Sequence, residues 1–354
     1  MDAPYNRHGG LTLVPMPGFE SWAKLLKIEI EERGTRESER PTPVDIVNPN
    51  FGVRSSGEPF IRLGKHHIGG HDCMVLGSGP GTSDMLIKLI FLLRYLKGRH
   101  AARIATFFGY FPLGRSDKDE GDQEFALPPL IIDAMMCMTY NQLDRIISMD
   151  LHAPQVVMSG RTGIITEVSM LRRLLQTAIK DASANGMKLC LAFPDSTAFK
   201  RAEKPLRKIQ KEYEISLPAV YGLKDRISSE EIKSLTLLGQ VEAVKGARVL
   251  SIDDEIATFN TNVTSAGQLK KDYGAAEVWS VVTHGVFCGP AAERLSDPDC
   301  PVDRIYVTDS IPFESRKHLQ PLITQEKIRV IPILVDLAWI VYNHHWDESI
   351  RVVR

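Results

Sequence analysis

Several features that define common protein classes are missing from this 354-residue sequence. Its five cysteines are odd in number and lack CxxC spacing, which argues against a disulfide framework and against a structural zinc site. Lysine and arginine number 43 against 44 aspartate and glutamate residues, so no overall basic field would recruit nucleic acid or an anionic membrane. The longest apolar stretch, 85–96, contains Lys88 and Arg94 and is too short to span a bilayer.

Targeting and nucleotide-binding signatures are missing as well. Residues 1–10 contain no apolar segment of the kind found in signal peptides, which together with the scattered cysteines favours a reducing, cytoplasmic location. No GxxxxGK[ST] sequence is present, which argues against a P-loop kinase. The glycine-rich stretch 77–81 (GSGPG) is not a GxGxxG motif and supports no dinucleotide fingerprint.

Short apolar runs alternate with longer amphipathic stretches along most of the chain, which is typical of a parallel α/β architecture. The pattern occurs before about residue 160 and again after it, so we predict two α/β domains with mainly parallel sheets flanked by helices. The predicted strands are 73–77, 103–109, 145–149, 189–193, 219–222, 248–252, 278–283, 304–308 and 329–332; the predicted helices are 19–32, 83–95, 128–138, 167–182, 197–213 and 261–273. We expect a first domain over 45–165, joined by an N-terminal helix and exposed connection (1–44), a second over 166–340, and a tail over 341–354.

Parallel sheets bind ligands at the carboxyl ends of their strands, and the polar clusters of this sequence follow the apolar runs. The sharpest cluster is RVLSIDDEIATFNT, in which Asp253 and Asp254 precede Thr258 and Thr261. Carboxylates accept hydrogen bonds from ribose hydroxyls, while threonine hydroxyls and N–H groups at a helix N-terminus bind phosphate. This segment predicts a phosphosugar site; an acidic turn with a threonine helix cap is the alternative.

Two further clusters place acids where a metal or a polyphosphate would bind. Asp150 and His152 lie two residues apart after a strand, so they face the same side and form a plausible divalent-metal or triphosphate contact. Asp195 follows the next strand and precedes Lys200 and Arg201 at a helix start. The alternatives are a structural histidine and an aspartate helix cap beside a solvated basic turn.

Two more clusters supply cations. Arg115, Asp117 and Lys118 lie on a loop after a strand and suit nucleotide phosphates, although a solvated charged loop has the same composition. Lys224 and Arg226 begin a polar stretch that reaches residue 233, and such a loop can close over a transferring group. Acids for a sugar and a metal, combined with cations for polyphosphate, favour phosphoryl-type transfer, in which positioning and charge neutralisation do most of the catalysis.

With these residues in view, the chain resembles the ribose-phosphate pyrophosphokinases, also called phosphoribosyl diphosphate synthetases. The resemblance extends from about Asp45 to the C-terminus and rests on several ordered matches. These are MDLHAPQ (149–155), FPDSTAFKRA (193–202), the lysine-x-arginine pair Lys224 and Arg226, THGVFCGPA (283–291) and TDSIP (308–312). The resemblance implies two phosphoribosyltransferase-like domains and a homo-oligomer, built from dimers or reaching a hexamer, in which a neighbour completes the ATP site.

The resemblance also implies roles for individual residues. His152 would contact the ATP phosphates and Mg²⁺, and Asp195 would be a second carboxylate near the metal. Lys224 and Arg226 would stabilise the transferring diphosphoryl group. Arg115 and Asp117 match an Arg-Gln-Asp segment that binds ATP, and Glu58 matches the acid that recognises adenine. The segment from Asp253 to Thr261, including Phe259 and Asn260, would bind the ribose phosphate.

That segment departs from the family pattern, Asp-Asp-x-x-Asp-Thr followed by small residues and a threonine. Ala257 replaces the third acid, and Phe259-Asn260 replace the small pair. Glycine allows backbone N–H groups to close on a 5′-phosphate, and Asn260 tolerates a positive φ better than Phe259 does. Ser116 also replaces the family glutamine, and Arg54 replaces an aromatic that packs on adenine.

Three interpretations of the sequence follow from these departures. In the first, the protein transfers the β,γ-diphosphoryl group of ATP to ribose 5-phosphate and releases AMP. In the second, the acceptor is a 5′-extended ribose such as ADP-ribose, with Phe259 stacked on its adenine. In the third, the chain is a non-catalytic assembly partner. The presence of His152, Asp195, Lys224 and Arg226 together argues against this last interpretation and favours an ATP- and Mg²⁺-dependent enzyme.

Overall fold

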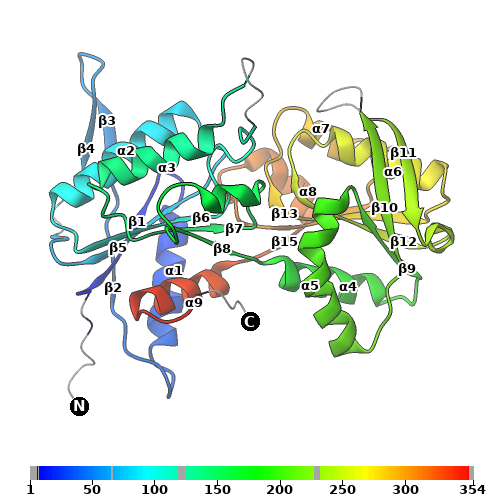
Figure 1. The fold of residues 1–354 in the computed structure, drawn as a ribbon, viewed down its shortest axis with the longest axis horizontal. Helices are drawn as coiled ribbons and strands as arrows, with labels where there is room; N and C mark the ends of the chain where they lie inside the picture. The colour runs from blue at the N-terminus through cyan, green and yellow to red at the C-terminus, as the bar shows by residue number, and fades with distance from the viewer. Residues whose placement is uncertain (1–5, 7, 65–66, 119–123, 227–231, 351–354) are drawn as a thin grey trace. The chain divides into compact units, whose positions relative to one another are not determined.

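The chain forms two compact units in the computed structural model, which describes residues 6, 8–64, 67–118, 124–226 and 232–350 (Figure 1). Unit 1 comprises residues 1–168 and 333–354, and unit 2 comprises residues 169–332. Each unit is a sheet covered by helices, so the predicted α/β class with two domains is confirmed for the fold. No helix among the described residues is long and apolar enough to cross a membrane.

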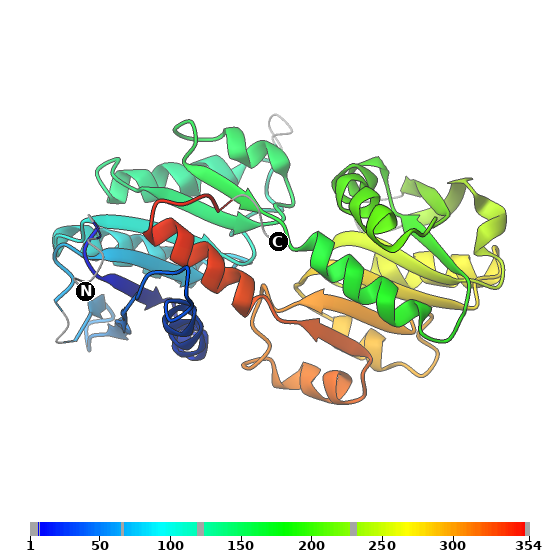
Figure 2. The same ribbon diagram turned by 90° about the horizontal axis from the view of Figure 1, so that it is seen from below.

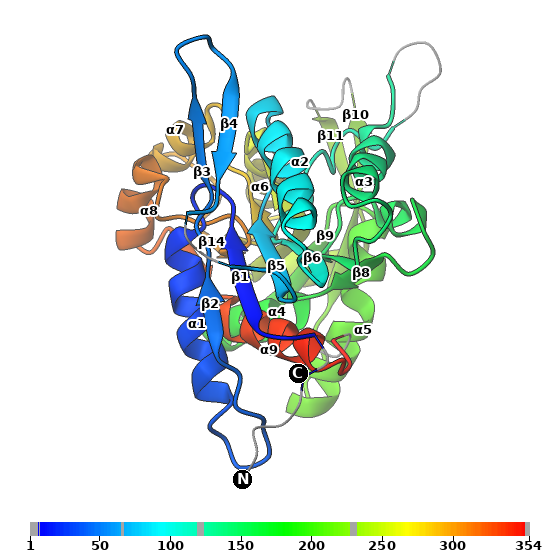
Figure 3. The same cartoon turned by 90° about the vertical axis from the view of Figure 1, so that its left-hand side faces the viewer.

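Unit 1 contains a six-stranded parallel sheet in the order β2-β1-β5-β6-β7-β8. Figures 2 and 3 show helices on both faces of this sheet, which explains why every residue of β5 and β6 is buried. A separate antiparallel hairpin, β3–β4, projects from the unit (Figure 3). The strands are β1 (Leu11–Pro15), β2 (Val44–Ile46), β3 (Asn50–Val53), β4 (Pro59–Arg62), β5 (Asp72–Gly77), β6 (Arg103–Phe108), β7 (Arg145–Met149) and β8 (Ile165–Val168); the helices are α1 (Glu20–Arg33), α2 (Ser83–Gly98), α3 (Leu127–Met138), α9 (Leu334–His345) and the 3₁₀ turn η1 (Pro154–Met158).

Unit 2 contains a seven-stranded sheet in the order β11-β10-β9-β12-β13-β14-β15, parallel except for the β10–β11 pair. Two apolar layers cover its faces, one formed with α4 and α5 and the other with α6, α7 and α8. The strands are β9 (Leu189–Phe193), β10 (Ala219–Arg226), β11 (Ile232–Gly239), β12 (Arg248–Ile256), β13 (Glu277–Gly285), β14 (Arg304–Thr308) and β15 (Ile328–Ile331); the helices are α4 (Leu171–Ser183), α5 (Ser196–Tyr213), α6 (Asn260–Lys271), α7 (Ala291–Ser296), α8 (Gln320–Thr324) and the 3₁₀ turns η2 (Val241–Val244) and η3 (Lys317–Leu319).

The C-terminal segment differs from the expected tail. After β15 the chain returns to unit 1, where α9 packs against α1. Arg103 at the start of β6 donates to the carboxylate of Asp72 and, at 2.8 Å, to the carbonyl of His344, while His345 Nδ1 lies 2.9 Å from Asp72. Burial opposes ionisation of Asp72, but hydrogen bonds from His345 and Arg103 outweigh it and lower the pKa of Asp72 to about 2. This network fixes the end of α9 to the amino ends of β5 and β6.

One predicted helix is also shorter than expected. The predicted helix 167–182 begins at Leu171, because Ile165–Val168 forms strand β8 beside β7. The β-branched residues of this segment continue the sheet of unit 1, whereas the leucine-rich stretch after Ser169 belongs to unit 2. The boundary between the units therefore lies between Val168 and Ser169, three residues after the predicted one.

Candidate functional site

The two adjacent acids of unit 2 lie inside β12 and not after it, because β12 continues beyond the predicted end at residue 252. The extension pairs with β13, where Asp253 is opposite Val282 and Glu255 is opposite His284. Asp254 accepts a hydrogen bond from Arg201 of α5 across 3.2 Å, and both side chains are largely buried. This ion pair joins two predicted clusters, the Asp-Asp pair and the basic start of α5.

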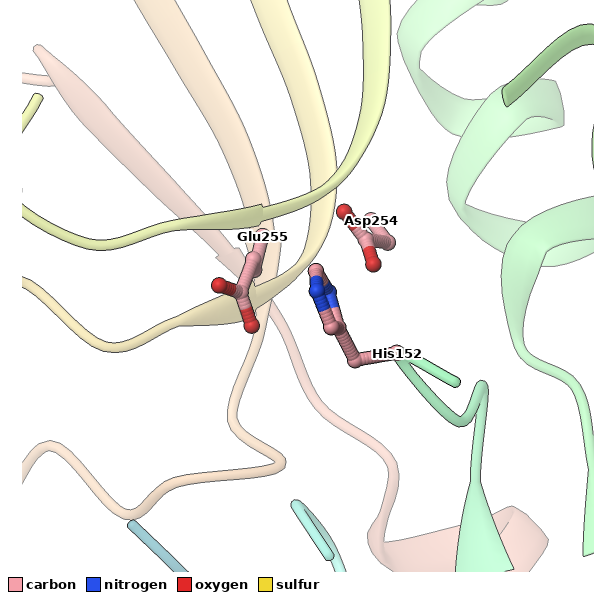
Figure 4. Close-up of side chains that lie close together, drawn as sticks. All are labelled: His152, Asp254 and Glu255. Carbon is pink, nitrogen blue, oxygen red and sulfur yellow. The ribbon is translucent and has the colours of Figure 1, made fainter. Parts of the chain in front are cut away.

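Glu255 is a further acid that the sequence interpretation left without a role. It is 9% exposed, and one of its carboxylate oxygens lies within 4.8 Å of a carboxylate oxygen of Asp254. Figure 4 draws Asp254, Glu255 and, from unit 1, His152. Two carboxylates at this separation within one strand end are a suitable oxygen donor set for a hard divalent cation.

The turn after β12 corrects the expected conformation of Phe259 and Asn260. Phe259, not Asn260, has the left-handed backbone, with φ 67° and ψ 4°, and Asn260 is the first residue of α6. The Phe259 ring is 1% exposed and lies in the apolar core of unit 2. The ring is therefore not placed to stack on a ligand, and the observation that favoured a 5′-extended acceptor is lost.

A small pocket lies at the carboxyl ends of β9 and β12. Its polar lining residues are Ser251, Asp253, Thr261, Asn262 and Ser265, and Pro194 also lines it. Thr261 and Asn262 belong to the first turn of α6, where N–H groups without an intrahelical acceptor and the positive end of the helix dipole favour an anion. The predicted carboxylate and threonine are thus brought together at one pocket of unit 2.

Asp195 has the local role given as its alternative. Its Oδ1 accepts hydrogen bonds from the N–H groups of Thr197 and Ala198, both at 2.9 Å, so Asp195 caps the N-terminus of α5. Both cap hydrogen bonds are accepted by the same carboxylate oxygen, so the geometry of Asp195 is explained by the helix cap without a bound metal. Lys224 and Arg226 lie on β10 and not on the predicted loop, because β10 continues to Arg226 and pairs there with β11, where Leu235 and Ile232 are opposite the two residues. Their side chains, and residues 227–231 of the predicted loop, are outside the part of the structure that is described.

In unit 1, the predicted metal or polyphosphate pair follows β7. Asp150 has a positive φ of 32° and is held by a 3.0 Å hydrogen bond from its N–H to the carbonyl of Val168. The N–H of Leu151 donates to Glu167 Oε1 across 2.8 Å, which fixes the turn between Asp150 and His152. His152 is half-buried at the carboxyl end of the unit 1 sheet.

The predicted ATP segment lies beside this turn. A Cβ atom on Gly114 would be 3.9 Å from that of His152, and Asp117 accepts a 2.9 Å hydrogen bond from Gln155 in the MDLHAPQ segment. Arg115 and Lys118 on the same loop are exposed. The structure therefore brings the DLH and Arg-Ser-Asp segments together, although they are separate in sequence.

Glu58 is apart from these residues, in the turn that connects β3 and β4. It is exposed, and its carboxylate accepts a 2.9 Å hydrogen bond from Ser56. Arg54 precedes the same turn, and its guanidinium lies 5.4 Å from the centre of the Phe60 ring. Arg54 thus packs on Phe60 of its own hairpin. By the family resemblance, an aromatic residue that packs on adenine would occupy position 54.

The THGVFCGPA and TDSIP segments have a structural role. They begin within the carboxyl ends of the adjacent strands β13 and β14, where Thr308 Oγ1 donates to the Thr283 carbonyl at 2.6 Å and His284 Nδ1 lies 2.9 Å from Ser310 Oγ. These four side chains are buried. The two motifs therefore bind each other and fix the loops at this edge of the sheet.

The fold and these residues define a two-unit α/β protein with charged and polar side chains at the carboxyl ends of its strands. A family model described as phosphoribosyl synthetase-associated domain matches residues 207–353. A phosphoribosylpyrophosphate synthetase from Mycobacterium smegmatis has a similar fold, with a TM-score of 0.75 at 23% identity, over 96% of this chain and 99% of that one.

Sequence similarity to two named proteins shows the family to which the chain belongs. A ribose-phosphate pyrophosphokinase of Nitrosomonas europaea is 30% identical over 272 residues, which cover 76% of this chain and 80% of that protein. Another from Rhodopirellula baltica is 29% identical over 301 residues, or 85% of this chain and 88% of that protein. The chain belongs to the ribose-phosphate pyrophosphokinase family, as the motifs predicted.

Proposed function

We propose that this protein is an ATP-dependent pyrophosphokinase that transfers the β,γ-diphosphoryl group of ATP to the anomeric hydroxyl of ribose 5-phosphate. The hydroxyl oxygen forms a bond to the β-phosphorus, the bond from that phosphorus to the oxygen of the α-phosphate breaks, and AMP leaves. The hydroxyl proton is released in the same step. The family membership of the chain supports this reaction, because its relatives carry the name of that activity.

The observation that carries the proposal is the β12–α6 turn of unit 2. It brings the carboxylate of Asp253 and the first-turn residue Thr261 to one pocket of unit 2, and Asp254 follows Asp253 in β12. Carboxylates suit the ribose 2- and 3-hydroxyls, and the helix N-terminus suits the 5-phosphate. Thr258 and the backbone of Phe259 and Asn260 complete the same turn, whereas the buried Phe259 ring does not.

Roles for the other groups follow from their charge. Lys224 and Arg226 neutralise the transferring diphosphoryl group as negative charge redistributes in the transition state. Arg115 and Lys118 bind ATP phosphates, Asp117 orients that loop through Gln155, and Glu58 recognises adenine. These roles are proposals that rest on the family resemblance and on the charges of the side chains.

Mg²⁺ is the proposed metal, and the donors present fit it. Asp254 and Glu255 offer carboxylate oxygens within 4.8 Å of each other, and Mg²⁺ prefers such oxygens while it keeps several waters. Asp150, His152 and Asp195 are further proposed contacts of the metal region. When bound, Mg²⁺ would neutralise phosphate charge and orient the β-phosphorus toward the acceptor.

An acceptor panel tests the proposed function. AMP release from ATP is followed with ribose 5-phosphate, ADP-ribose and unphosphorylated ribose, and we expect ribose 5-phosphate to give the highest kcat/KM. The double variant Asp253→Asn/Asp254→Asn should lose most activity, whereas Lys208→Ala, on the exposed side of α5, should not. A preference for ADP-ribose would contradict the assigned acceptor. No AMP with any acceptor would support the non-catalytic interpretation.

The proposed assembly is a homo-oligomer of this chain, dimer-based or hexameric, as the resemblance implies. Light scattering during size-exclusion chromatography of the full chain measures its mass. A monomer at the concentrations used for the activity assay, with full activity, would contradict the proposal that a neighbour completes the ATP site.

A further inference from the structure

The ribose-phosphate loop, residues 253–261, is held by hydrogen bonds to its backbone carbonyls. Three consecutive carbonyls accept hydrogen bonds from the segment 287–294: Ile256 from the N–H of Phe287 at 3.0 Å, Ala257 from the N–H of Cys288 at 3.1 Å, and Thr258 from Arg294 Nη1 at 2.7 Å. The first two donors are backbone groups, but the third is a side chain of α7. Arg294 is therefore the one member of this set that a substitution can remove cleanly.

The direction of these carbonyls determines where the N–H groups of the loop point. In a planar trans peptide, the C=O and the following N–H lie on opposite sides. Because the carbonyls of residues 256, 257 and 258 face the segment 287–294, the N–H groups of Ala257, Thr258 and Phe259 face the other way. Successive N–H groups on one face of a turn form an anion-binding concavity, here continuous with the first turn of α6.

Phe259 fixes the same peptides from the other end of the turn. Its left-handed backbone is a conformation that favours glycine, yet the residue is held there by a ring that is 1% exposed. The ring packs in the same core as Ile256, Phe287 and Leu295, the last on the helix that carries Arg294. Packing thus replaces the conformational freedom of the family's small residues.

We infer that Arg294 and Phe259 are positioning residues that hold the ribose-phosphate loop in its anion-binding form. This inference rests on the proposed function and adds to it a reason why the loop works without glycine. Arg294 acts through the Thr258 carbonyl and orients the N–H of Phe259 toward the acceptor phosphate. Neither side chain needs to touch the substrate for this role.

The test is the split between KM and kcat in Arg294 variants. Arg294→Gln removes a charged hydrogen-bond donor, and we expect KM for ribose 5-phosphate to rise about tenfold. KM for ATP and kcat should change by less than about twofold, because the lost group acts on acceptor binding alone. Arg294→Lys keeps a cation near the carbonyl and should restore part of the loss.

A matched control separates positioning from general stability. Arg304 is the first residue of β14, at the amino ends of the strands and thus at the opposite end of the same sheet from the loop. It pairs with Glu326 at 3.3 Å. Arg304→Gln should leave KM for ribose 5-phosphate unchanged even if it lowers the melting temperature. Calorimetric binding of ribose 5-phosphate, with the enzyme saturated by an ATP analogue that cannot be cleaved between its α- and β-phosphates, gives a second readout without turnover.

The outcomes distinguish this inference from the proposed function. If the wild-type chain releases AMP with ribose 5-phosphate but Arg294→Gln leaves KM and binding of that acceptor unchanged, the positioning role is wrong. An equal rise in KM for ATP would also overturn it. If the wild-type chain releases no AMP, the proposed function fails first, independently of any variant.

Discussion

Replacing Phe259 tests whether the core holds a strained turn. The ring is buried, so Phe259→Ala should cost about 3–5 kcal/mol of unfolding free energy. Phe259→Gly loses the same ring but also relieves the left-handed conformation at φ 67°. That relief is worth about 1–2 kcal/mol, against about 0.4–1 kcal/mol for the greater chain entropy of unfolded glycine. We therefore expect the glycine variant to be the more stable of the two, by about 0–1.6 kcal/mol.

Urea unfolding of the two variants measures this difference, and a helical position supplies the opposite sign. Lys208 is exposed in α5, where Lys208→Ala should be more stable than Lys208→Gly by about 1 kcal/mol. The reasoning would be refuted if the alanine variant were more stable than the glycine variant at position 259, since the backbone strain inferred from the turn would then be absent.

Four further predictions concern the chemistry and the unit 1 network. AMP release should require a divalent cation, best Mg²⁺, and full activity in excess chelator would contradict the proposed metal. Lys224→Ala and Arg226→Ala should each lower kcat by about 10²-fold or more with little change in KM for ATP; equal losses of ATP binding would make them simple phosphate anchors. Asp195→Asn keeps a good helix cap, so a loss of activity with an unchanged melting temperature would show that the negative charge of Asp195 matters for activity. Asp195→Ala removes the cap as well and should lower the free energy of unfolding by about 1 kcal/mol. The pKa of Asp72 is lowered to about 2 in the folded protein, so its ionised form stabilises the fold above its unfolded pKa of about 3.9, and this stability is lost as pH falls toward 2. Asp72→Asn should therefore weaken the decrease of the melting temperature at acid pH. An unchanged decrease would contradict the network.

The sequence by itself determined the elements that depend on local chemistry. Mainly apolar runs such as 145–149 and 304–308 form strands at the predicted residues, because a strand covered on both faces is buried along most of its length. The polar clusters lie at the carboxyl ends of the strands because parallel sheets leave their backbone and loops accessible there. The ordered motifs also predicted the family, which the similarity to a ribose-phosphate pyrophosphokinase confirms.

Tertiary structure decided what depends on distant residues. The sequence marked Asn260 as the residue that tolerates a positive φ, but the turn places Phe259 there, because burying the ring outweighs the strain. Arg294 has no local signal that links it to Thr258, since 36 residues separate them and only the packing of α7 brings them together. The return of α9 to unit 1 was equally hidden, because the partners of its last turn, such as Asp72, lie at the amino ends of strands far earlier in the chain. Local propensity depends on a few neighbouring residues, whereas contacts between distant residues depend on how the whole chain packs.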